Sequence, residues 1–295
     1  MLPSFEFLAT LHDDPSSRMK RIAVSLVALV VLGYLGAIGY LVASETSIVF
    51  HADVPFGALR PAAPFEQLEQ RREDGGTRIT WIMRLPAGTD HAPWVVFLHG
   101  NGAPVSARLN ILHYERLRQL GLNVIAPEYR GYAGTGGVPT EAGVERDGRS
   151  AYDYLTGTLH VPPSQIVIFG WSLGSAVAVD VASHVPSAGV VLEGSPSSLV
   201  DIGQIRYPFI PIRLLMRNPF DSIAKIGRVS APLLFLHSPE DTVVPIAEGR
   251  RLFGAARPPK EFVEVHGGHV YAVERDPRFF SYVRAFLAAH GVLRH

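Results

Sequence analysis

A serine set between two glycines constrains this chain more than any other feature. The residues Gly170–Gly174, GWSLG, end an apolar run, Gln165–Gly170, and precede a run of small residues, Ser175–Val181. We expect the first run to be a strand and the second to be the start of a buried helix. A sharp strand-to-helix turn strains the backbone of its central residue, Ser172, and the flanking glycines remove Cβ atoms that would collide there. The turn therefore predicts an exposed serine nucleophile beside unpaired N–H groups that can stabilise negative charge.

Short apolar runs alternate with amphipathic runs along most of the remaining chain. A glycine-containing turn at 73–76 predicts a hairpin between strands at Phe65–Arg72 and Thr77–Arg84. The later predicted strands are Trp94–Leu98, Asn123–Pro127, Gln165–Gly170, Gly189–Leu192, Pro232–His237 and Glu261–Val265. The predicted helices are Ala107–Leu120, Glu141–Leu155, the run from Ser175, Ile246–Phe253 and Pro277–His290. This alternation predicts an α/β fold with a mostly parallel sheet covered on both faces, and catalytic groups at the carboxyl ends of its strands.

Composition excludes several function classes. The net charge of zero gives no basic surface for nucleic acid, so we expect no nucleic-acid partner. The chain has no cysteine, which excludes disulfides, thiolate catalysis and cysteine-ligated zinc. It has no H-E-x-x-H run, and no G-x-G-x-x-G follows the first parallel strand, so we expect neither a metal nor a dinucleotide cofactor. The oligomeric state is left open.

An uncharged apolar stretch, Ile22–Ala43, lies near the N-terminus. As a helix it would cover about 30 Å, which is the thickness of the hydrocarbon core of a bilayer. We interpret it as a single transmembrane anchor; a signal peptide cut near Val42–Ser44 is the alternative, although its apolar part would be unusually long. Because Arg18, Lys20 and Arg21 precede the stretch, the positive-inside rule places the N-terminus in the cytoplasm and the bulk of the chain on the opposite, periplasmic or extracytoplasmic, side.

The chain is expected to have four parts. These are a cytoplasmic leader at 1–21, the anchor, a proline-containing tether at 44–64 and a globular domain at 65–295. A short lid insertion at 195–231 interrupts the domain, and Asp221 is expected to cap a helix there. The insertion carries an apolar series of Ile205, Tyr207, Phe209, Ile210, Ile212, Leu214, Leu215 and Met216. This series fits either an acyl-chain pocket or a helix packed on the sheet.

A serine hydroxyl needs a base, and the base needs an acid to orient it. His269 follows the last predicted strand after two glycines, so it is our candidate base, with His266 as the alternative. Asp241 follows the strand that ends at position 237 and is our candidate acid; Glu240 and Glu193 are rivals, and an aspartate also suits such a polar turn for purely structural reasons.

The oxyanion hole is expected to combine two backbone N–H groups. One belongs to Leu173, and the other to Asn101 in the glycine-rich loop His99–Gly102, which could also be a plain strand exit. The catalytic order serine, aspartate, histidine along the chain is the one expected for α/β-hydrolases.

These motifs together resemble the serine α/β-hydrolase superfamily, and more narrowly its abhydrolase-domain branch. The resemblance covers roughly residues 94–290 and includes HGN at 99–101 and YRGY at 129–132. It implies a nucleophile, acid, base and two oxyanion donors at Ser172, Asp241, His269, Leu173 and Asn101. The segment after YRGY departs from the usual glycine-rich pattern, and Ser175 stands where glycine or alanine is common.

We therefore expect a membrane-tethered serine hydrolase that cleaves a carboxylic ester or thioester of a small-molecule or lipid acyl substrate. Ester, thioester and amide bonds share this machinery, so the bond type and acyl-chain preference stay open. The alternatives are a serine peptidase of the same fold and a catalytically silent binding or scaffolding protein.

Overall fold

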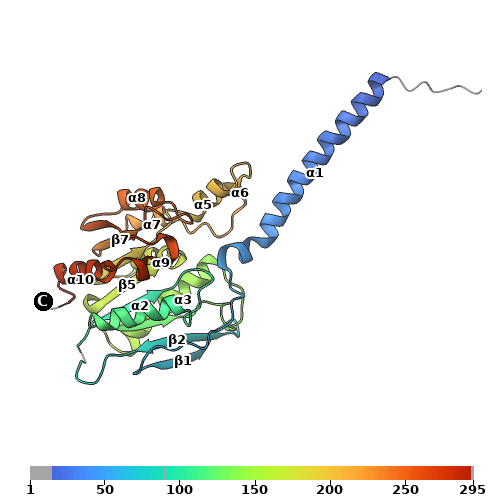
Figure 1. Cartoon of the computed structure of the whole chain (residues 1–295). Coiled ribbons are helices and arrows are strands. Elements are labelled where there is room, and N and C mark those ends of the chain that lie inside the picture. Colours follow the sequence, from blue (N-terminus) through green and yellow to red (C-terminus); the bar gives the residue numbers. More distant parts are fainter. Residues whose placement is uncertain (1–14, 90, 294–295) are drawn as a thin grey trace, which may run out of the picture. The chain divides into compact units, whose positions relative to one another are not determined.

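The computed structural model describes residues 15–89 and 91–293. The chain divides into two units, Met1–Ser44 and Glu45–His295. Residues 1–14 of the predicted leader lie outside the described residues. Figure 1 shows the elements of both units.

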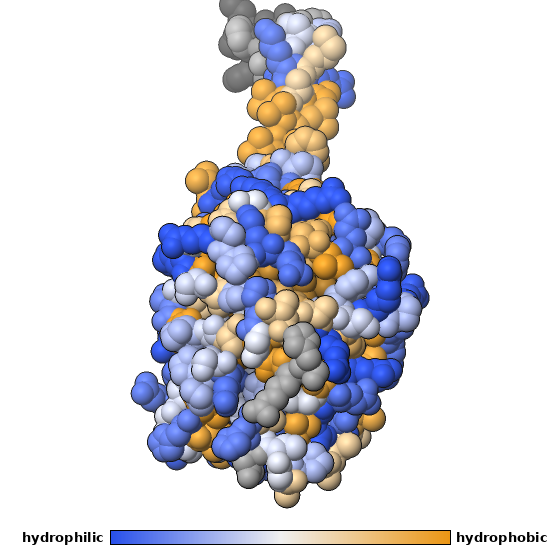
Figure 2. Space-filling view, turned by 90° about the vertical axis from the view of Figure 1, so that its left-hand side faces the viewer, coloured by the Kyte–Doolittle hydropathy of each residue, from blue (hydrophilic) through white to orange (hydrophobic). Residues whose placement is uncertain are grey.

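One long helix, α1 (Pro15–Phe50), contains the predicted anchor. Its most apolar 18-residue window has a mean hydropathy of 2.4 and none of it is buried, so by length and composition it could cross a membrane, as could a signal sequence. Figure 2 shows this apolar stretch as an orange band. The tether predicted at 44–64 is corrected over its first residues: α1 continues to Phe50, and Glu45, Val49 and Phe50 are buried in the second unit.

An eight-stranded sheet forms the centre of the second unit, and it contains every strand predicted from the sequence, with ends shifted by a residue or so. The strands are β1 (Glu66–Arg71), β2 (Thr77–Met83), β3 (Trp94–Leu98), β4 (Asn123–Pro127), β5 (Ile166–Trp171), β6 (Gly189–Glu193), β7 (Leu233–His237) and β8 (Lys260–Glu264). Their order in the sheet is β1-β2-β4-β3-β5-β6-β7-β8. β2 pairs antiparallel with both β1 and β4, and all the other pairs are parallel.

Helices cover both faces of the sheet, as Figure 1 shows. After α1 they are α2 (Arg108–Gln119), α3 (Glu141–Asp153), α4 (Leu173–His184), α5 (Leu199–Arg206), α6 (Ile212–Leu215), α7 (Ser222–Ile226), α8 (Ile246–Ala255), α9 (Gly268–Arg275) and α10 (Phe279–Ala289). A π-helical turn at Tyr154–Thr158 extends α3, and a 3-10 turn at Pro163–Gln165 precedes β5. The sequence did not predict α9, whereas α5 and α6 lie in the insertion for which a helix was one of two interpretations. The cap at Asp221 is confirmed, because its carboxylate accepts the N–H of Ala224 at 3.3 Å.

Successive side chains of a strand point to opposite faces of the sheet, so each strand contributes to two hydrophobic cores. In β3, Val96 and Leu98 face one core together with α3, α4, α7 and α8, whereas Val95 and Phe97 face a second core with α2, α9 and α10. All five residues of β3 are buried, as expected for a parallel strand covered on both sides. The predicted α/β fold is therefore confirmed, and the carboxyl ends of β3, β5, β7 and β8 meet at one edge.

Candidate active site

The turn between β5 and α4 has the strained backbone that its glycines predict. Ser172 has φ 54° and ψ −120°, a combination that L-residues rarely adopt. A Cβ on Gly170 would lie 2.3 Å from the carbonyl oxygen of Gly174, so only glycine fits there. The Ser172 N–H donates to the Glu193 carbonyl at 2.8 Å, which ties the turn to the end of β6.

The three residues predicted to act together lie in one hydrogen-bonded row. Ser172 Oγ is 2.7 Å from His269 Nε2, and His269 Nδ1 is 2.7 Å from Asp241 Oδ2. Ser172 follows β5, Asp241 follows β7 and His269 follows β8. His269 does not lie on a plain loop: Gly267, with φ 116°, turns the chain, and the imidazole comes from the first turn of α9. The geometry lets His269 accept the hydroxyl proton while the carboxylate fixes its tautomer.

The carboxylate of Asp241 is buried and hydrogen-bonded through both of its oxygens. Its Oδ1 accepts the N–H groups of Val243 at 2.9 Å and Val244 at 2.8 Å. Burial raises the pKa of Asp241, but hydrogen bonds with His237 and His269 outweigh burial and hold the pKa well below its usual range. The carboxyl is therefore ionised and suited to stabilise an imidazolium.

Sequence reasoning missed His237, the last residue of β7. Its Nε2 is 2.9 Å from the Val244 carbonyl oxygen and 3.5 Å from Asp241 Oδ2. Gly249 of α8 packs against the ring, since a Cβ there would lie 2.2 Å from His237 Nδ1. The available signal was its position at the carboxyl end of the strand that precedes the acid.

The rival candidates have other partners. His266 Nδ1 lies 3.3 Å from Glu240 Oε1, and both side chains are largely exposed beside the row. Glu193 faces His113 of α2, with Oε2 2.9 Å from Nε2, and both side chains are buried. The His113 ring stacks at 5.7 Å on Trp171, whose indole N–H donates to the His269 carbonyl at 3.2 Å. The buried His113–Glu193 pair therefore packs against Trp171 and stabilises the turn between β5 and α4.

The predicted oxyanion loop approaches the serine closely. A Cβ on Gly100 would lie 3.3 Å from Ser172 Cβ, so glycine lets the main chain pass there. Leu173 is the first residue of α4, and Asn101 follows Gly100. Beneath the loop, His99 Nε2 lies 3.0 Å from Glu128 Oε1, with both side chains fully buried. Nothing in the sequence predicted this second buried histidine–glutamate pair.

The oxyanion loop also contacts the end of α1. Asn101 Nδ2 donates to the Val49 carbonyl at 3.1 Å, and the Gly102 N–H donates to the Phe50 carbonyl at 3.2 Å. Tyr132 also donates its hydroxyl to the Phe50 carbonyl. The Phe50 ring is fully buried and meets the Phe220 ring edge-on at 5.9 Å. Residues just after the apolar stretch are thus part of the support of the active-site loop.

A pocket of about 360 Å³ opens at Ser172. It is lined by Gly100, Asn101, Gly102, Ala103, Ala107, Arg108, Leu109, Trp171, Ser172, His269, Val270 and Tyr271. These residues come from the segment between β3 and α2, the start of α2, the turn between β5 and α4, and α9, and none belongs to the described insertion at 195–231. The acyl pocket suggested for the insertion is therefore not part of this cavity. A bidentate ion pair between Arg108 and Glu274 joins α2 to α9.

Comparison with known proteins agrees with the fold. The model of the alpha/beta hydrolase family matches residues 95–225. The chain is 19% identical to the Pyrococcus furiosus esterase in a solved structure, with a TM-score of 0.66, covering 80% of this chain and 97% of the esterase. An esterase from Butyrivibrio proteoclasticus, Est1E, is 14% identical with a TM-score of 0.62, over 76% and 98% of the two chains.

Similarity in sequence extends over nearly the whole chain. An uncharacterized protein of Mycobacterium tuberculosis is 33% identical over 275 residues, which is 92% of this chain and 97% of the relative. The human alpha/beta hydrolase domain-containing protein 17B is 26% identical over 194 residues, or 66% of each chain. With the described sheet, strand order and elbow, these similarities show that the chain belongs to the alpha/beta hydrolase family.

Proposed function

We propose that the chain is a serine hydrolase that cleaves a carboxylic ester or thioester through an acyl-enzyme intermediate. The observation that carries the proposal is the row of two 2.7 Å contacts joining Ser172, His269 and Asp241 at a strained turn. A base within hydrogen-bond reach of a hydroxyl, and oriented by a buried carboxylate, is the arrangement that nucleophilic catalysis requires.

The proposed reaction has two halves. In the first, Ser172 Oγ attacks the acyl carbon as its proton passes to His269 Nε2. The N–H groups of Leu173 and Asn101 stabilise the oxyanion, and the imidazolium then protonates the leaving alcohol or thiol. In the second, His269 deprotonates a water molecule that attacks the acyl-enzyme, and the serine hydroxyl is restored. Asp241 stays ionised throughout, which its lowered pKa favours.

We also propose that α1 anchors the enzyme in a membrane, with the N-terminus in the cytoplasm and the hydrolase domain on the opposite side. Its uncharged stretch of high hydropathy and the basic residues Arg18, Lys20 and Arg21 before it support this topology. We propose a small-molecule or lipid acyl substrate, and the pocket of about 360 Å³ at Ser172, at the small end of the usual range for ligand sites, favours a short acyl group.

A fluorophosphonate probe tests the catalytic proposal on the full chain in detergent. We expect labelling of the wild type and of Ser183→Ala, and no labelling of Ser172→Ala. Ser183 is the matched control because it lies on the same helix, α4, and donates its hydroxyl only locally, to the Asp180 carbonyl at 2.8 Å. A folded wild-type protein that takes no label would instead favour a silent binding or scaffolding protein.

Hydrolysis of p-nitrophenyl esters of increasing chain length then defines the acyl site. We expect turnover to fall steeply once the acyl chain exceeds the pocket, and to be absent in Ser172→Ala. A peptidase would cleave amide substrates at rates comparable with those of the esters, which the proposal excludes.

A further inference from the structure

In the insertion between β6 and β7, several large apolar side chains are unusually exposed to solvent. Phe209 and Leu214 are 87% and 84% exposed, and Ile205 is 60% exposed. No large apolar side chain of the predicted anchor is more than 71% exposed. A soluble surface rarely gathers such side chains in a dozen residues, and where it does, the patch commonly marks an interaction site.

The end of this insertion is fastened to the residue that follows the apolar stretch. Glu45 is buried and its carboxylate accepts four hydrogen bonds of 2.8–2.9 Å, from the backbone and side chains of Arg217 and Asn218. Burial raises the pKa of Glu45, but these hydrogen bonds outweigh it and lower the pKa, so the contact is an ionised one. Glu45 is two residues from Ala43, the last residue of the predicted span, and consecutive Cα atoms are about 3.8 Å apart. Arg217 must therefore lie close to the point where the chain leaves the apolar stretch.

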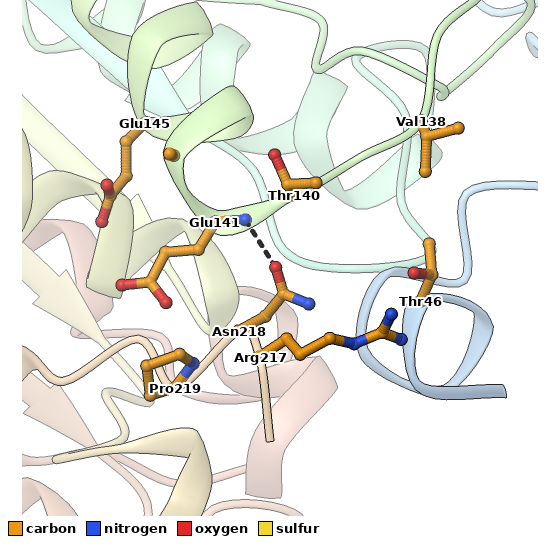
Figure 3. Close-up of a pocket in the computed structure, with 9 residues that line it drawn as sticks. Thr46, Val138, Thr140, Glu141, Glu145, Arg217, Asn218 and Pro219 are labelled. Carbon is orange, nitrogen blue, oxygen red and sulfur yellow. Dashed lines mark hydrogen bonds between the residues drawn. The ribbon is translucent and has the colours of Figure 1, made fainter. Parts of the chain in front are cut away.

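A second element contributes apolar surface at the same place. Thr46, Val138 and Arg217 line a pocket of about 510 Å³, shown in Figure 3, and Val138 is 66% exposed. Asn218 braces this pocket by accepting the N–H of Glu141 through its side-chain oxygen at 2.8 Å. The four most exposed large apolar side chains of the second unit are thus Phe209, Leu214 and Ile205 on the insertion and Val138 at the pocket that the end of the insertion lines.

The charge of the insertion suits a lipid surface. Arg206, Arg213 and Arg217 are exposed and alternate with the apolar side chains along the segment. Arg213 pairs with Asp201 and Arg217 pairs with Glu45, yet the two arginine side chains remain 66% and 60% exposed. Arginine beside exposed phenylalanine and leucine is the composition of interfacial segments that bind anionic phospholipid headgroups.

We propose that the segment Ile205–Arg217 docks on the anionic phospholipid surface of the bilayer that α1 crosses. Ile205, Phe209 and Leu214 enter the acyl region, and the arginines remain at the level of the headgroups. A bilayer is the proposed occupant because the hydrogen bonds to Glu45 keep the end of the segment, Arg217, within two residues of the apolar stretch that would cross it. This inference depends on the membrane anchor proposed above.

The absence of cysteine in the chain allows a direct test by single labels. The full-length variants Phe209→Cys, Leu214→Cys, Leu59→Cys and Leu35→Cys are labelled with an environment-sensitive fluorophore and placed in phosphatidylcholine–phosphatidylglycerol vesicles. Quenching by nitroxide on the lipid acyl chains is compared with quenching by aqueous iodide. Leu59 is the matched control, since it is 50% exposed but lies outside the insertion; Leu35 reports the anchor itself.

We expect the labels at positions 209 and 214 to be quenched by acyl-chain nitroxide and protected from iodide, and the label at position 59 to show the reverse. Lipid quenching at position 35 with iodide quenching at 209 and 214 would overturn the docking surface and leave the anchor intact. Iodide quenching at all four positions would overturn the anchor, and the docking surface with it. Retained fluorophosphonate labelling checks that each variant is folded.

Discussion

The backbone contact at Gly174 gives the sharpest test of the proposed active site. A Cβ at this position would lie 2.0 Å from the Leu98 carbonyl oxygen and 2.5 Å from that of His99. Both are main-chain atoms at the end of β3, where the oxyanion loop begins, so no side-chain rotation can relieve the clash. Gly174→Ala must therefore separate the elbow from the loop by about 1 Å, because real contacts of this kind are rarely under 3.0 Å.

The effect on turnover follows from that displacement. The serine is carried by the elbow and one proposed oxyanion donor by the loop, and misplacing such groups by about 1 Å lowers the rate roughly 100-fold. Overpacking of this kind also costs about 1–3 kcal/mol of stability. We expect kcat for a p-nitrophenyl ester to fall about 100-fold or more with little change in KM, and Tm to fall by several degrees.

Gly254→Ala is the matched control. Gly254 lies in α8, and a Cβ there would meet nothing within 4 Å. The same substitution should raise stability slightly, by up to about 1 kcal/mol, and leave kcat unchanged. If Gly174→Ala kept wild-type kcat, the close approach of elbow and loop would have no catalytic meaning and the reasoning would be refuted.

Three further predictions follow from the site and its surroundings. Asp241→Asn should lower kcat by about 10,000-fold, because the amide presents the wrong partner to the imidazole; steady-state kinetics with esters would detect it, and an unchanged kcat would contradict the assigned acid. Asn101→Ala keeps the backbone N–H but removes the 3.1 Å bond to the Val49 carbonyl, so kcat should fall by up to about tenfold at constant KM; a change in KM alone would speak against a positioning role. Burial raises the pKa of Glu145 to about 7, despite its ion pair with Lys225, from a usual value of 4.5. The folded state then holds a proton that the unfolded state releases, so stability should fall as pH rises from about 5 to 7; thermal melts of Glu145→Gln should lack this slope, and an identical slope in both proteins would refute the assignment.

The turn at Ser172 could be predicted from the sequence because its motif and the strand and helix on either side of it lie within a few residues of one another. Two glycines between a strand rich in β-branched residues and a helix of small residues are typical of a nucleophile elbow. This pattern places Ser172 at the centre of the turn. Asp241 and His269 were accessible for a related reason: each follows an apolar strand, and parallel strands end at one edge of the sheet.

The sequence could not predict contacts between distant residues that no motif marks. His113 and Glu193 are 80 residues apart, and nothing near either one indicates that they form a buried pair. Glu45 falls in the segment predicted to be a tether, because that segment contains several prolines. In the structure, hydrogen bonds from residues more than 170 positions away satisfy its carboxylate, so the helix continues into the domain. Only a folded chain supplies such partners.

The hydrogen bonds at Glu45, Val49 and Phe50 limit how far the chain can be shortened from its N-terminal side. Release by a protease acting after Ala43 would leave all three residues on the liberated fragment, which should retain its fold and its oxyanion loop. A recombinant fragment that starts at Phe65, the boundary suggested by the sequence alone, would lack the Phe50 ring and the two carbonyls that receive Asn101, Gly102 and Tyr132. The shortest fragment that keeps all of these contacts therefore begins at Glu45.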